Sequence, residues 1–79
     1  MKLPRDLSGI ELADHLCALW DYARVHQVGS HMILETPKPF PHRVSVPAHK
    51  VLRVGTLNGI VRAVAAHKGV CREQILRGL

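Results

Sequence analysis

The first regular pattern along the chain is a helical one that begins near Ser8. Residues 8–11 match a capping box, in which the Ser8 hydroxyl accepts from the backbone N–H of Glu11 while the Glu11 carboxylate accepts from that of Ser8. Leu7 and Leu12 occupy the two positions of a hydrophobic staple around this start. The sequence therefore predicts a helix that begins after Ser8.

Apolar side chains continue this helix at a spacing of three to four residues. They form a stripe that we expect to be buried, made of Leu12, Leu16, Leu19 and Trp20. The outward face is expected to carry Glu11, Asp14 and His15. The helix is predicted to end near Asp21 or Tyr22.

From residue 23 the pattern becomes typical of β-strands. Residues 23–27 and 31–36 are rich in β-compatible side chains, and Gly29-Ser30 breaks the run between them, which predicts a hairpin. Residues 37–41 contain three prolines and suit a stiff connection without regular structure. Residues 43–46 alternate again until Pro47 ends them. Three short strands joined in sequence predict an antiparallel meander.

A second helical pattern follows Gly55. Thr56 is the expected N-cap, and Gly69 is expected to close the helix in a left-handed conformation. One face of this helix is filled by Leu57, Ile60, Val61, Val64 and Ala65. A short last helix over residues 72–79 follows the poor N-cap Cys71 and is expected to turn inward Ile75, Leu76 and Leu79.

The predicted order is helix, three strands, helix and short helix, which is an α+β fold class in one domain over residues 1–79. Two helices packed on one face of the sheet would leave its other face partly open. A chain near this length buries only about 60% of the surface that its unfolded form exposes. A deep, enclosed cofactor site is therefore not expected.

Composition points to a cytoplasmic protein. No apolar run approaches the roughly 20 residues that a membrane helix needs, and residues 1–6 have no apolar core of a signal peptide. Two isolated cysteines, Cys17 and Cys71, cannot build a secreted disulfide framework, so both thiols are expected to fill the core.

Charge is distributed unevenly. Residues 1–22 contain Lys2 and Arg5 against four acids, a net charge of −2, whereas residues 23–79 contain nine cations against two acids, a net charge of +7. A basic body of this kind attracts polyanions, and nucleic acid is the commonest polyanion in a cytoplasm. A solvated basic surface that serves only solubility is the plainer alternative.

Six histidines occur in 79 residues, and four of them fall in the predicted sheet and its loops. These four are His26, His31, His42 and His49. Their spacings match no compact metal-ligand pattern, and no cysteine or carboxylate lies close to them in sequence, so no metal site is expected. His15 and His67 lie on predicted helices and are expected to be ordinary surface or packing residues.

Histidines beside cations can instead cleave RNA without a metal. This reaction needs the 2′-hydroxyl deprotonated, the 5′-oxygen protonated and the phosphoryl charge stabilised. Gly29-Ser30 would place His31 at the start of a strand facing a groove, because glycine permits a tight backbone path. The candidate phosphate contacts are Arg24, Lys50 and Arg53.

Four short motifs together resemble the HicA toxin family of toxin–antitoxin modules. They are Leu7-Ser8-Gly9, Gly29-Ser30-His31, Val46-Pro47-Ala48-His49 and Leu52-Arg53-Val54-Gly55-Thr56-Leu57 leading into Ile60. The resemblance runs from about Leu3 to Ala65, and the order and spacing of the motifs make it specific. This chain departs from the family where members often have arginine and another polar residue before Gly-Ser-His. It has His26 and Val28 there, and Arg24 is the expected substitute cation.

The resemblance implies a fold similar to the double-stranded RNA-binding domain (dsRBD-like), endoribonuclease cleavage of mRNA without a cofactor, and neutralisation by a HicB-type antitoxin. The family's catalytic histidine falls on His31, which Gly29 and Ser30 would position. His49 matches the histidine of the Val-Pro-x-His segment, with a supporting or substrate-contacting role.

Two other functions remain open from the residues alone. A non-catalytic RNA-binding module of the same fold would recognise A-form geometry through phosphate and 2′-hydroxyl contacts. A structural or regulatory protein could act only through a partner, including on DNA as a complex. The second proton-transfer group also stays open between His49, His26 and a water.

Overall fold

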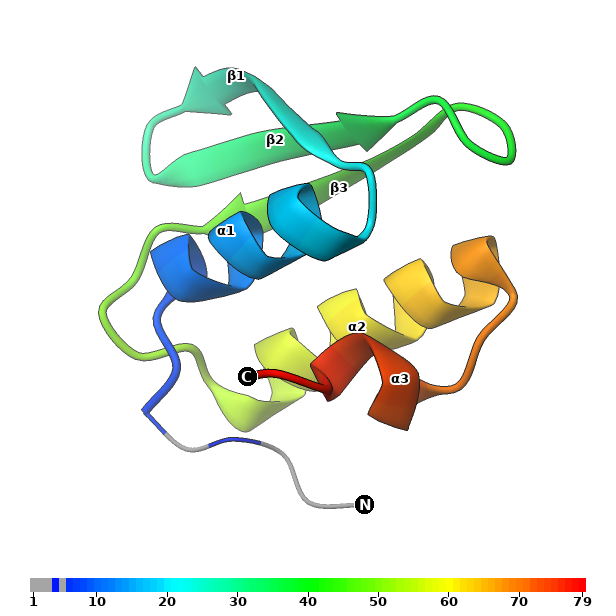
Figure 1. Cartoon of the computed structure of the whole chain (residues 1–79). Coiled ribbons are helices and arrows are strands. Elements are labelled where there is room, and N and C mark those ends of the chain that lie inside the picture. Colours follow the sequence, from blue (N-terminus) through cyan, green and yellow to red (C-terminus); the bar gives the residue numbers. More distant parts are fainter. Residues whose placement is uncertain (1–3, 5) are drawn as a thin grey trace.

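The computed structural model describes residue 4 and residues 6–79 (Figure 1). The cations Lys2 and Arg5, and Leu3 at the start of the family resemblance, lie outside the described residues. The elements in chain order are α1 (Gly9–Leu19), β1 (Ala23–Val28), β2 (His31–Thr36), β3 (His42–Pro47), α2 (Val54–Lys68) and α3 (Arg72–Leu76). The predicted α+β order is thereby confirmed.

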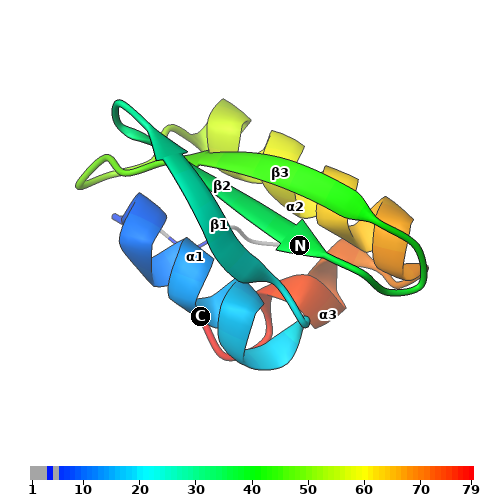
Figure 2. The ribbon, with the colours of Figure 1, turned by 90° about the horizontal axis from the view of Figure 1, so that it is seen from above.

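The three strands form one antiparallel sheet in the order β1-β2-β3. Both long helices lie on the same side of it, α1 beneath β1 and α2 beneath β3 in the view from above (Figure 2). The short helix α3 packs against α2. The opposite face of the sheet carries no helix among the described residues, as expected when both helices pack on one face.

Alternation along the strands separates the two faces. Met32, Leu34 and Thr36 of β2 are buried under the helices, whereas His31 between the turn and Met32 is exposed on the open face. Strand β3 continues the same alternation in register, with Leu34 opposite Val44. The largest fully buried apolar side chains are Leu12, Leu16, Leu34, Val46, Leu57, Val61, Val64 and Ile75.

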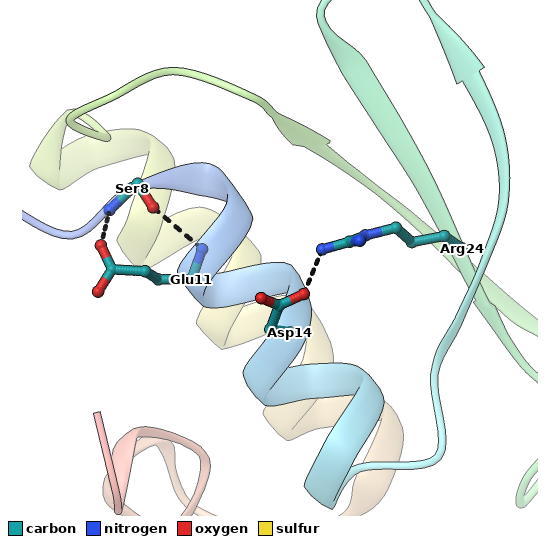
Figure 3. A network of polar contacts seen from close by, with 4 residues as sticks. All are labelled: Ser8, Glu11, Asp14 and Arg24. Atoms are coloured by element: carbon teal, nitrogen blue, oxygen red, sulfur yellow. Dashed lines mark hydrogen bonds and ion pairs between the residues drawn. The ribbon is translucent and has the colours of Figure 1, made fainter.

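The start of α1 confirms the predicted capping box (Figure 3). The Ser8 hydroxyl accepts from the Glu11 backbone N–H at 3.0 Å, and the Glu11 carboxylate accepts from the Ser8 N–H at 3.1 Å. These two bonds satisfy backbone groups that the first turn of a helix leaves without partners. The first residue of α1 is therefore fixed by its own sequence.

The outward face and the end of α1 differ from the prediction. His15 is buried, and its Nε2 donates to the carbonyl oxygen of Ile75 at 2.6 Å. Leu19 is 61% exposed, and the helix ends there, with Trp20 as its half-buried C-cap. The burial of His15 has a tertiary cause, because its ring contacts Ile75 of α3 and lies near Gly78, and helical periodicity does not reveal those neighbours.

The predicted start of α2 is wrong, whereas its predicted end is correct. The helix begins at Val54 with Arg53 as N-cap and without a side-chain cap bond, so Thr56 already lies in its first turn. Gly69 takes φ of 70° at the C-cap, as expected for a residue that closes a helix in the left-handed region.

The last helix is shorter than predicted. It ends at Leu76, and Leu79 is 37% exposed, although Ile75 and Leu76 are buried as expected. Cys17 is half-buried, but Cys71 is exposed, so the prediction that Cys71 fills the core is wrong.

Within the described part of the chain, no helix has the length and apolarity needed to cross a membrane.

Candidate active site at the hairpin end of the sheet

The turn between β1 and β2 consists of Gly29 and Ser30. Gly29 has φ of 59°, a left-handed conformation that costs an L-residue roughly 1–2 kcal/mol and costs glycine almost nothing. Its carbonyl accepts from the Gln27 side chain at 3.1 Å, while the Ser30 carbonyl accepts from the Ala48 backbone N–H at 2.6 Å. The predicted tight backbone path before His31 is confirmed.

His31 is the first residue of β2 and lies between Val28 of β1 and Pro47 of β3. Its exposed imidazole projects from the open face, and its Nδ1 lies 3.2 Å from the hydroxyl oxygen of Ser45. A hydrogen bond at Nδ1 orients the ring. No described residue bonds to Nε2, which leaves this nitrogen available to a ligand.

The loop between β3 and α2 is tied to the start of α1 and to the hairpin turn. The Gly9 N–H donates to the His49 carbonyl at 2.9 Å, and the Leu52 N–H donates to the Leu7 carbonyl at 2.7 Å. A Cβ at Gly9 would lie 1.7 Å from the Pro47 carbonyl oxygen, so only glycine permits this approach. The motif Leu7-Ser8-Gly9 thus holds the loop that carries His49.

A pocket of about 380 Å³ opens where these segments meet. It is lined by His31, Pro47, His49, Val51, Leu52, Arg53 and Thr56. Three of the predicted site residues, His31, His49 and Arg53, therefore share one pocket although they come from a strand start, a loop and a helix N-cap. No carboxylate belongs to its lining.

The N-terminus of α2 also contributes to the pocket through Thr56 and the N-cap Arg53. No side chain caps this helix, and its first turn contains no acid. The first N–H groups of a helix carry partial positive charge and favour anions. Together with the Arg53 guanidinium they make the pocket suited to a phosphate group.

The other two predicted phosphate contacts are placed differently. Lys50 is exposed in the same loop but does not line the pocket. Arg24 lies opposite Leu34, three residues along β2 from His31, and its guanidinium forms an ion pair with Asp14 of α1 (Figure 3). The structure therefore does not bring Arg24 to the pocket.

His26 lies on the open face opposite Ile33, in the row of side chains next to that of His31. It does not line the pocket, unlike His49. Within the described residues, no group of three or more His, Cys, Asp or Glu side chains could hold a metal ion. His49 is thus the histidine that shares a cavity with His31.

Two contributors to the site were missed by sequence reasoning. Ser45 contacts His31, and Thr56 lines the pocket instead of capping a helix. The alternation of β3 could have placed Ser45 on the face of His31, because His31 and Ser45 both alternate with buried neighbours. Thr56 was missed because α2 starts three residues earlier than its local signals indicate.

No protein-family model, curated protein or solved structure matches this chain.

Proposed function

We propose that this chain is a HicA-like toxin of a type II toxin–antitoxin module, an endoribonuclease that cleaves mRNA without a metal or cofactor and has a dsRBD-like fold. The observation that carries the proposal is the single pocket shared by His31, His49 and Arg53 beside the uncapped N-terminus of α2. The net charge of +7 over residues 23–79 adds a long-range attraction for RNA.

In the proposed reaction one imidazole removes the proton of the RNA 2′-hydroxyl. The 2′-oxygen attacks phosphorus, the bond to the 5′-oxygen breaks, and a protonated imidazole donates its proton to that leaving oxygen. His31, through its free Nε2, and His49 are the pair available to divide these two tasks. The products are a 2′,3′-cyclic phosphate and a 5′-hydroxyl.

Charge on the nonbridging phosphoryl oxygens must be stabilised while the bond is exchanged. Arg53 offers planar N–H donors, and the first backbone N–H groups of α2 offer fixed ones that need no reorganisation. Lys50, exposed in the same loop, would contact a neighbouring phosphate outside the pocket.

Cleavage in excess EDTA tests this proposal. Single-stranded RNA is incubated with the native protein, with His31→Ala and with His49→Ala, and His26→Ala serves as a matched exposed histidine that does not line the pocket. Loss of a positioned acid or base should cut the rate about 100-fold or more. His26→Ala should keep the native rate. A full-rate His31→Ala protein would reject the mechanism.

The alternative is a non-catalytic RNA-binding module of the same fold. The exposed cations and the uncovered face of the sheet favour it, since both suit binding without chemistry. RNA that is bound but intact, with affinity falling steeply as salt rises, would support this alternative.

A HicB-type antitoxin would be expected to cover the same basic surface in either case. Nucleic-acid binding, including DNA, seen only with the partner present would favour a regulatory role.

A further inference from the structure

A second pocket lies at the opposite end of the sheet, where the end of α1, the loop after β2 and the end of α2 meet. It has a volume of about 490 Å³ and is lined by Leu19, Trp20, Asp21, Lys38, Pro39 and Lys68. The strand β2 connects the two ends, with His31 first and Thr36 last. Its length of roughly 17 Å, from about 3.3 Å per residue, separates this pocket from the candidate active site.

The wall of this pocket is held in place by the end of α2. The Lys68 ammonium donates to the Thr36 hydroxyl at 2.9 Å and to the Lys38 carbonyl at 2.8 Å, and His67 Nε2 donates to the same carbonyl at 3.1 Å. His67 also stacks on His42, with ring centroids 4.2 Å apart. The loop of residues 37–41 is therefore joined to α2, and the pocket is a fixed feature of the fold.

The positive charge in the pocket is only partly offset by the groups around it. Lys68 bonds to neutral oxygens and its Nζ lies 5.0 Å from the centroid of the Tyr22 ring, and no carboxylate in the described chain forms an ion pair with it. Burial lowers the pKa of Lys68, Asp21 raises it and Lys38 lowers it. An incoming carboxylate would add a second favourable charge, because opposite charge favours the protonated lysine.

The remaining lining is apolar. Leu19 is 61% exposed on the end of α1, and Pro39 is exposed on the loop across from it. Trp20 also lines the pocket, but its Nε1 is buried without an acceptor among the described residues and has no surface that a ligand could reach.

We propose that this pocket binds an acidic peptide segment of a protein partner, with an aliphatic side chain on Leu19 and Pro39 and a neighbouring carboxylate at Lys38 and Lys68. The lining decides between peptide and RNA. Leu19 and Pro39 offer an apolar surface that suits an aliphatic side chain. Two lysines against Asp21 leave the lining with a net charge of only +1, which favours a single carboxylate over a chain of phosphates.

The inference does not rest on ribonuclease activity, and its test needs none. Trp20 is the only tryptophan of the chain, so its fluorescence and its indole N–H resonance report on this pocket alone. The native protein is titrated with the acetylated, amidated peptide Leu-Glu-Leu-Glu and, separately, with Leu-Gln-Leu-Gln. The acidic peptide should give a saturable change in both signals, and the neutral peptide should bind more weakly.

Lys38→Gln is the decisive variant, because the Lys38 side chain makes no described bond and its loss should leave the fold unchanged. Lys38→Gln should weaken the affinity for the acidic peptide about two- to fivefold, and Lys68→Gln should act in the same direction. Lys50→Gln, at the other end of the molecule, should change nothing. Equal binding of both peptides, no saturable signal, or a lysine-dependent response to a short RNA instead would overturn the proposal.

Discussion

At the scale of single residues, the contact between Ser45 and His31 brings a residue of β3 into the candidate active site. The two side chains come from neighbouring strands on the open face and lie 3.2 Å apart. A hydrogen bond at Nδ1 orients the ring and leaves Nε2 without a partner among the described residues. Ser45 would act as a positioning residue for the proposed reaction.

Ser45→Ala should therefore lower the cleavage rate constant without weakening RNA binding. A net hydrogen bond of about 0.5–1.5 kcal/mol corresponds to roughly a two- to twelvefold decrease. Single-turnover kinetics with trace RNA and increasing protein concentration separate the cleavage rate constant from RNA binding. Ser45→Thr, which keeps the hydroxyl, should restore the rate. A decrease in binding alone would contradict the assigned role.

Two glycines should respond to alanine in opposite directions. At Gly29 the left-handed φ of 59° makes Gly29→Ala destabilising by roughly 1–2 kcal/mol. At Gly59, inside α2 with no atom within 4 Å of a new Cβ, alanine should stabilise by up to about 1 kcal/mol. Urea unfolding measures both, and a stabilising Gly29→Ala would show that the turn relaxes to another conformation.

At the scale of elements, the prolines, the alternating strands and the α1 capping box were predictable, because each signal lies within a few residues of what it specifies. The inward turn of His15 was not predictable, because its acceptor at Ile75 is 60 residues away. The site divides in the same way. His31 could be chosen from its turn, whereas its grouping with Arg53 and Thr56 depends on how Gly9 docks the loop.

At the junction of β2, β3 and α2, the surroundings of His42 predict that the free energy of unfolding depends on pH. Burial lowers the pKa of His42, and the nearby His67 and Lys68 lower it further. Since the folded state binds this proton less tightly than the unfolded state, His42 stabilises the fold above its ordinary pKa of about 6.5, and that stability is lost as pH falls below it. Tyr22, whose hydroxyl lies 3.0 Å from His42 Nδ1, faces the same ring.

Urea unfolding on either side of about pH 6.5 measures this effect. The free energy of unfolding should decrease toward acid in the native protein and decrease less in His42→Gln. His26→Gln removes an exposed histidine from the open face and should keep the native pH dependence. If His42→Gln retained the full acid dependence, another group would be responsible.

At the scale of the whole molecule, the two pockets occupy opposite ends of one sheet and differ in character. The hairpin end combines histidines, Arg53 and a helix N-terminus without an acid in the lining. The other end combines lysines with Asp21 and apolar side chains. Under the two proposals above, a protein partner would hold the second end while RNA occupies the first, and a partner that contacted both ends at once would block the proposed cleavage.

The hydrogen bond from His15 to Ile75 sets an order in which parts of this small fold can be completed during synthesis. A ribosome completes α1 first, yet the acceptor for its buried imidazole emerges only 60 residues later. Until then the nascent helix that anchors the His49 loop through Gly9 lacks part of its support. The support of the His49 loop is thus complete only after α3 has been synthesised and has left the ribosome, which would keep the proposed cleavage activity from appearing on a partly made chain.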